Sequence, residues 1–289
     1  MKIYLDKDLV KDLDTDALLV YVALRSIYHK GEEELYVSIN MLCYRLYGNV
    51  TYTRTFKDNI INGFNNLDTR GIIRIKEQIN KSEFIIDASG LYFEDKFFVG
   101  IDLEYIRRTC NCSSRVDRGS LVKYLLVMIG TMCNDPYKFQ DVQVRHMKGL
   151  VGFMPISYIA QESGISEQTA LSYNTILEDA KIIYIYRHGH SYQDIDGNIK
   201  SINNNYGLYE NKKEVLGYAS GFARMQGYTV QDGDANKRRS LAAKYNALCN
   251  GVQYTQEEVQ EIYEYIHKKN QNLAYGEVAR DESVFEGVI

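Results

Sequence analysis

Two pairs of closely spaced side chains could bind a metal ion. Cys110 and Cys112 flank one asparagine, and His188 and His190 flank one glycine. Zinc sites usually have wider ligand spacing and a second ligand pair, and no second pair lies near the cysteines in the sequence. A hairpin tip accounts for the histidines without a ligand. We therefore predict no metal and no other cofactor.

Sequence motifs of common enzymes are missing as well. The chain contains no GxxxxGK[ST], no GxGxxG after a predicted strand and no GxSxG. Its carboxylates are spread along predicted exposed faces, so no general acid/base pair stands out. The expectation is a protein without enzymatic activity and without catalytic residues.

Basic and polar side chains that suit DNA gather in residues 53–81. Lys and Arg neutralise phosphates, whereas polar side chains on a helix can reach base edges in the major groove. The segment has six basic residues against Asp58, Asp68 and Glu77. An ordinary solvated helix face would have the same composition. The predicted contacts are Thr53, Arg54 and Lys57 on a helix, followed by Arg74, Lys76 and Lys81 in a hairpin.

Two further groups of candidates follow. Arg107, Arg108 and Arg115 form a basic hinge that could lie along phosphates, or equally a solvated linker. A later helix and wing offer the polar and basic side chains Gln168, Thr169, Ser172, Tyr173, Arg187 and His188. Glu167, Glu178 and Asp179 weaken attraction to DNA there, so this second copy binds either DNA or a dimer partner or another protein.

The elements that would position these residues are recognisable from hydrophobic periodicity. Apolar residues at helical spacing predict helices over residues 15–30, 38–46 and 53–70, with Gly71 ending the third. Short β-type runs occupy residues 35–37, 72–75 and 84–86, with a polar connection over 76–83. Three helices followed by a hairpin is the order of a winged helix.

The same order returns about one hundred residues later. Residues 121–132 predict a helix, 152–154 a short β segment, and Ser157 and Ser166 begin two more helices. A β-rich run over 182–187 follows. Residues 67–75 align with 177–185, which makes duplication a reasonable reading.

The predicted fold class is mainly α with small β-hairpins (α+β), as two winged-helix domains followed by a helical C-terminal region. The expected boundaries are 1–102 for the first domain, 103–116 for a linker, 117–211 for the second domain and 212–289 for the remainder. Within the last part, helices are expected over 213–226, 235–249 and 255–269, with a loose tail from 277.

Composition is compatible with this organisation. The 289 residues are 45% hydrophobic and 25% charged, which are ordinary globular values. A net charge of -4 counts mildly against nucleic acid binding, although the basic residues are clustered. The N-terminus lacks signal-peptide features, and the richest apolar run, 121–129, is shorter than the roughly 20 residues of a membrane span. Five scattered cysteines suggest no disulfide framework. We expect a cytoplasmic protein.

The chain resembles proteins of Gram-positive mobile elements that carry winged helices, such as plasmid and phage replication initiators and replisome organisers. The resemblance lies in residues 18–28 with 37–46, in 66–75, and in 156–185 of the second copy, together with the Asn-rich segment 203–211. It implies binding to repeated origin sequences, often as a homodimer, and recruitment of replication machinery by the C-terminal part. That part has no residue-by-residue match.

The resulting functional hypothesis is sequence-specific binding of double-stranded DNA, in replication or maintenance of a plasmid, phage or integrative element. A transcriptional regulator of the same architecture has every feature described so far. A third hypothesis is a winged-helix adaptor that binds protein, supported by the acidic second helix and the negative net charge.

Overall fold

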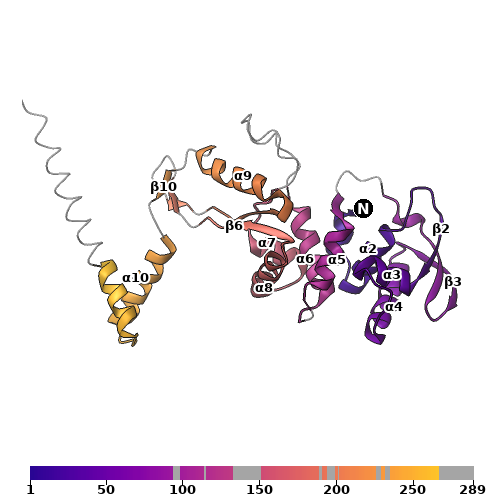
Figure 1. The fold of residues 1–289 in the computed structure, drawn as a ribbon, viewed down its shortest axis with the longest axis horizontal. Coiled ribbons are helices and arrows are strands. Elements are labelled where there is room, and N and C mark those ends of the chain that lie inside the picture. Colours follow the sequence, from indigo (N-terminus) through magenta and orange to yellow (C-terminus); the bar gives the residue numbers. More distant parts are fainter. Residues whose placement is uncertain are drawn as a thin grey trace, which may run out of the picture. The chain divides into compact units, whose positions relative to one another are not determined.

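The computed structural model describes residues 1–93, 98–113, 115–132, 151–188, 191–193, 199–200, 202–225, 229–231 and 235–266. They form a mixed fold of helices and small antiparallel sheets, compatible with the expected α+β class (Figure 1). The chain divides into two compact units. Unit 1 comprises Met1–Arg187 and Asn203–Gly221, and unit 2 comprises His188–Ile202 and Phe222–Ile289. Among the described helices, none combines the length and hydropathy needed to cross a membrane.

The first half of unit 1 has the predicted order of three helices and a hairpin. Its elements are α2 (Thr15–Arg25), β2 (Glu34–Ser38), α3 (Ile39–Tyr47), α4 (Arg54–Thr69), β3 (Arg74–Asn80) and β4 (Glu83–Asp87). The strands form one antiparallel sheet in the order β2-β4-β3. Side chains of Asp14, Ser38 and Thr53 cap the three helices by accepting backbone N–H groups.

Two boundaries differ from the sequence prediction. Helix α2 ends at Arg25 rather than at residue 30, because Ser26 turns the chain and its hydroxyl donates to the Ala23 carbonyl at 2.6 Å. The expected polar connection over 76–83 is mostly strand, closed by a short turn between β3 and β4. The hairpin is therefore longer and its turn tighter than predicted. Gly71, at φ 70°, does end the third helix region as expected.

Helix α4 packs closely on α2. A Cβ atom at Gly63 would lie 2.6 Å from the carbonyl oxygen of Asp16, so only glycine permits this approach. Phe64 on the same face stacks on Phe84 of β4 with 4.9 Å between ring centroids. These contacts bury one face of α4 in the core and leave the opposite face in solvent.

An N-terminal addition was not predicted. Strand β1 (Lys2–Asp6) pairs antiparallel with β5 (Phe98–Asp102), and α1 (Lys7–Asp12) and the 3-10 turn η1 (Ser89–Leu91) lie beside them in sequence. Ile3 and Leu5 on one strand, and Val99 and Ile101 on the other, point inward and are buried. The alternation of buried and exposed residues explains why these segments form strands.

The second half of unit 1 repeats the order of the first. Its elements are α5 (Leu103–Asn111), α6 (Arg118–Gly130), α7 (Ile156–Ser163), α8 (Glu167–Asp179), β6 (Ile183–Tyr186), β9 (Asn205–Leu208), η4 (Tyr209–Asn211) and α9 (Lys212–Met225), of which α9 continues into unit 2. Strand β9 pairs with β6 on one side and, at Tyr206, with Gly152 on the other. Gly152 thus takes the place that β2 has in the first half.

Residues 103–111 do not connect two separate domains. Leu103, Ile106 and Cys110 of α5 are buried, and the helix packs against α3 and α6. Both halves therefore belong to one compact unit. The physical reason is the apolar stripe of α5, which is long enough to be a core element.

Unit 2 contains a small sheet and helices. Strands β7 (Ser191–Gln193), β8 (Ile199–Lys200) and β10 (Thr229–Gln231) form a sheet in the order β10-β7-β8. Helix α10 spans Ala235–Cys249, as predicted, and another helix spans 256–266. The predicted continuation to 269 and the tail from 277 lie outside the described residues.

Candidate nucleic-acid interface

The outward face of α4 is polar. Thr53 is the N-cap, and its side chain accepts the N–H of Phe56 at 3.2 Å. Arg54 follows with a side chain that is 94% exposed; its nearest acidic partner, Asp58, lies 3.9 Å away. An ion pair this long and exposed contributes little to stability. Arg54 can therefore turn to another anion at small cost.

Lys57 has a more specific environment. Its ammonium donates to the hydroxyl of Ser82 at 3.0 Å, and the side chain is half-buried. Ser82 lies in the turn between β3 and β4. Lys57 therefore joins the N-terminal part of α4 to the tip of the hairpin, and fixes the hairpin relative to the helix.

The basic residues of the hairpin are not equivalent. Lys76 forms an ion pair with Glu34 at 2.5 Å, and this carboxylate raises the pKa of Lys76. Arg74 and Lys81 are exposed and have no hydrogen-bond or ion-pair partner within the described ranges. Arg74 and Lys81 are the hairpin cations that remain available to a ligand.

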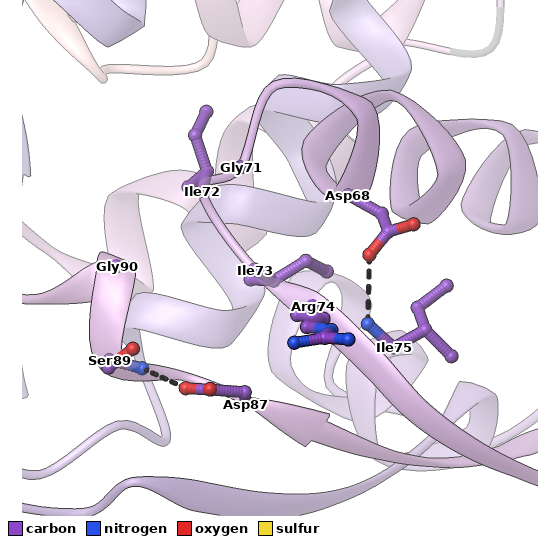
Figure 2. A pocket seen from close by; sticks show the side chains of 9 residues that line it. All are labelled: Asp68, Gly71, Ile72, Ile73, Arg74, Ile75, Asp87, Ser89 and Gly90. Atoms are coloured by element: carbon purple, nitrogen blue, oxygen red, sulfur yellow. Dashed lines mark hydrogen bonds between the residues drawn. The ribbon is translucent and has the colours of Figure 1, made fainter.

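Arg74 projects into a recess of about 490 Å³ at the base of the hairpin (Figure 2). Two carboxylates line the same recess, and both bind backbone: Asp68 accepts the N–H of Ile75 at 2.9 Å, and Asp87 accepts the N–H of Ser89 at 3.0 Å. The hydrogen bonds that Asp87 accepts from Ser89 are the main cause of its lowered pKa, and the positive charges of Lys76 and Arg74 lower it further. The carboxylates hold the turn, and the guanidinium is the group left for an external anion.

Arg107 and Arg108 are engaged within unit 1. The Arg107 guanidinium donates to the carbonyl oxygens of Arg45 at 3.0 Å and Tyr44 at 3.3 Å, in the last turn of α3. Arg108 donates to Ala180 and Lys181 at 2.6 and 2.9 Å, at the end of α8. Carbonyls at a helix C-terminus have no intrahelical donor and attract cations. Neither a basic hinge nor a solvated linker describes these arginines; they brace two helices.

Arg115 lies in the loop between α5 and α6, is exposed, and has no side-chain partner among the described residues. The loop residues 116–119 border α4, since Val116 and Asp117 line a recess of about 230 Å³ together with Thr55 and Asn59. Asp117 and Ser120 also interact with Tyr173 of α8. The start of α6 therefore lies between α4 and α8, and Figure 1 shows both helices toward the same edge of unit 1.

Helix α8 was predicted with the wrong rotation. The apolar residues Ala170, Leu171, Ile176 and Leu177 predict its inner face. Instead, Tyr173 is 5% exposed and packs edge-on against Tyr124, whereas Leu171 is 51% exposed. Asn174 can be buried because its side-chain oxygen accepts the Tyr124 hydroxyl at 2.8 Å. The predicted DNA contact at Tyr173 is therefore wrong: it is a core residue.

The other candidates on the second half are either exposed or bound to neighbouring residues of the chain. Gln168 and Ser172 are exposed on α8. Thr169 is half-buried and hydrogen-bonds Ser166 at the helix N-cap. Arg187 pairs with Glu178 through two hydrogen bonds, and His188 is half-buried in unit 2. The exposed face of α8 has no basic residue.

No group of three metal-binding side chains occurs among the described residues. Burial raises the pKa of Cys110 to about 12, which disfavours the thiolate that binds metals. His190 lies outside the described residues.

The amides of α4 were not among the contacts predicted from the sequence. Thr55, Asn59 and Asn62 are exposed on this helix, and asparagine can pair with adenine in the major groove. Their spacing of three to four residues along a helix was the available signal. Together with Arg54 and Asp58 they form an exposed surface that we call the reading face.

Comparison of the chain with family models, with curated proteins and with solved structures finds no match.

Proposed function

We propose that the chain is a sequence-specific binder of double-stranded DNA, and that each half of unit 1 is a winged helix. The element order and the strand order β2-β4-β3 support this assignment for the first half. The second half has the equivalent order, with Gly152, β9 and β6. Helix α4 would enter the major groove, and the β3–β4 hairpin would lie against the backbone.

The observation that carries the proposal is the reading face of α4. It is exposed, polar and rich in side-chain amides. It begins with Arg54, whose only ion pair among the described residues is long and exposed, and it lies beside the hairpin whose turn Lys57 binds through Ser82. Arg54, Arg74, Lys81 and Arg115 would contact phosphates, because they have no strong internal partner in the described part of the chain. The resemblance to proteins of mobile elements favours a role in replication or maintenance of such an element.

Selection of bound duplexes from a random pool tests the proposal directly. The full chain should enrich a preferred sequence, and affinity should fall with salt. Contacts with about four phosphates give a log–log slope of about -4. A pool without enrichment, or a flat salt response, contradicts duplex recognition. Arrays of direct repeats around the selected site would favour replication, and one palindrome at a promoter would favour regulation.

Charge reversal at Arg54 locates the contact. Arg54→Glu should weaken binding of the selected duplex at least about tenfold, because it removes one phosphate contact and adds repulsion. Lys213→Glu is the matched control, since Lys213 is exposed on α9 and the change in net charge is the same. Equal losses in both variants would mean that α4 is not the contact.

A second candidate function, binding of a protein partner, is favoured by one observation on α8. Leu171 is exposed at the centre of a face that has Glu167 and Ser172 but no Lys or Arg. Such a face suits an apolar protein contact better than a phosphate backbone. Leu171→Ser, with retained duplex binding and loss of association in a two-component assay, would assign α8 to a partner.

A further inference from the structure

The small sheet formed by β1 and β5 exposes two aromatic rings. Tyr4 is 43% exposed and Phe98 is 42% exposed, and their rings meet edge-to-face at 5.2 Å. Gly100 pairs with Tyr4 across the sheet and places no side chain between them; a Cβ there would lie 3.3 Å from the Tyr4 ring. The sheet therefore presents two exposed rings, almost perpendicular to each other.

The aromatic surface continues across the end of α2 through Arg25. Its guanidinium donates to the carbonyls of Tyr4 at 2.9 Å and Leu91 at 2.8 Å, and it lies 5.4 Å from the ring centroid of Tyr28 and 4.9 Å from that of Phe93. We name these two rings, together with those of Tyr4 and Phe98, the aromatic strip. Arg25 is thus held by backbone carbonyls beside the rings of Tyr28 and Phe93.

Cations alternate with these rings. The ammonium of Lys2 lies 5.8 Å from the Tyr4 ring centroid, and that of Lys30 lies 5.0 Å from Tyr92, next to Phe93. Two carboxylates at the ends of this sheet hold backbone groups. Asp6 accepts the backbone N–H groups of Asp8 and Leu9, and Asp102 accepts that of Glu104 together with the N-terminal amine. Lys2, Arg25 and Lys30 place positive charge beside the rings.

We propose that the aromatic strip is a binding site for single-stranded nucleic acid. Unpaired bases stack on exposed aromatic rings, and interleaved Lys and Arg side chains neutralise the backbone. Bases in a duplex have no free face for such stacking, so the strip would select unpaired strands. An exposed lysine binds a ring face weakly, so a base can replace Lys2 on Tyr4 and leave the ammonium beside a phosphate.

This site is separate from the proposed duplex contact. The strip lies on β1, on β5 and near the end of α2, whereas the duplex contact lies on α4 and the β3–β4 hairpin. The two sites therefore predict independent losses of function. A chain that binds duplex at one site and an unpaired strand at the other could stabilise a locally opened duplex.

Fluorescence anisotropy with labelled oligo-dT of about 15 nucleotides tests the site in the full chain. The wild type should bind, and affinity should fall with salt with a slope of about -0.7 per phosphate contacted. The double variant Tyr4→Leu, Phe98→Leu keeps apolar side chains but removes both rings. It should lose at least about tenfold in oligo-dT affinity, with unchanged circular dichroism and unchanged binding of the selected duplex.

Tyr36→Leu is the matched control, because Tyr36 is a strand tyrosine that is 54% exposed on the other sheet. It should bind oligo-dT like the wild type. Ultraviolet crosslinking to oligo-dT followed by mass spectrometry should place adducts on Tyr4, Phe93 or Phe98. The proposal is overturned by a wild type that does not bind, by a double variant that binds normally, by equal loss in Tyr36→Leu, or by adducts elsewhere. Binding to anionic vesicles without oligo-dT binding would overturn it in favour of a lipid surface.

Arg54→Glu separates this proposal from the duplex proposal. It should leave oligo-dT affinity unchanged while lowering duplex affinity. If no duplex is selected from the pool but oligo-dT still binds at the strip, the duplex proposal fails and the strip remains.

Discussion

Three basic side chains of unit 1 bind carbonyl oxygens at helix C-termini. Arg107 donates to the last turn of α3, Arg108 to the end of α8, and Lys123 to the carbonyl of Leu13 after α1 at 2.8 Å. These carbonyls have no intrahelical donor, and the helix dipole adds partial negative charge. A basic residue in this unit is therefore a candidate for DNA contact only where its side chain does not donate to a backbone carbonyl. Arg54, Arg74, Lys81 and Arg115 meet this condition in the described part of the chain.

Tyr173 gives the sharpest test at the scale of one residue. It is 5% exposed, against Tyr124, with ring centroids 5.7 Å apart. Tyr173→Ala should lower the free energy of unfolding by about 3 kcal/mol through cavity formation. Tyr173→Phe keeps the ring and should stay near wild type in both stability and duplex affinity. Urea unfolding and the duplex titration measure the two quantities. A stable Tyr173→Ala variant that fails to bind duplex would restore Tyr173 as a contact.

At the scale of elements, amphipathic spacing predicted most of the helices of unit 1 but not how each is rotated. In α4 the stripe of Ile60, Phe64 and Leu67 is buried as expected. In α8 the pattern was ambiguous, because Asn174 is buried through its bond to Tyr124 while Leu171 faces solvent. Periodicity treats a buried asparagine as polar, so it misjudged the inner face. A buried hydrogen bond between distant residues leaves no local trace in the sequence.

Long-range pairing escaped prediction for the same reason. Strands β1 and β5 are almost one hundred residues apart in sequence. Each is a short alternating run, and no hairpin turn joins the two strands directly. The candidate site was predicted at Thr53 and Arg54, where the N-cap signal is local. Arg107 and Arg108 were predicted as possible phosphate contacts, and their internal role was not predicted, because their carbonyl acceptors lie 62 and 72 residues away. Nothing in the spacing of two adjacent arginines identifies such partners.

Helix α5 yields a prediction at the same scale, since Arg108 ties it to the end of α8. Arg108→Gln should lower the free energy of unfolding by about 1–3 kcal/mol, because two carbonyl oxygens lose a charged donor. Arg115→Gln, an exposed arginine of the neighbouring loop, should change it by less than about 0.5 kcal/mol. Urea denaturation followed by circular dichroism compares them. Equal effects would mean that the brace does not stabilise the fold.

At the scale of the whole molecule, the two halves of unit 1 share one core. Helix α6 supplies Leu121, Val122 and Leu125, all fully buried, and it packs against α1 and α2 of the first half and α7 of the second. An ion pair between Lys11 of α1 and Glu162 of α7 also joins the halves. A shared core makes unfolding cooperative, because neither half can open without exposing apolar surface of the other. The shared core also fixes the position of α8 relative to α4, independently of what α8 binds.

Native-state hydrogen exchange tests that cooperativity with one substitution far from α8. Phe64→Ala removes a ring of the first half that stacks on Phe84, and it should cost about 3–4 kcal/mol. If unit 1 opens as a whole, the slowest amides of α8 should lose the same free energy of protection as those of α2, whereas amides of α10 in unit 2 should keep theirs. Two domains joined by a linker at 103–116 would behave differently: α2 would lose protection and α8 would not. The comparison of α2 with α8 in one experiment therefore decides whether the halves fold as a single body.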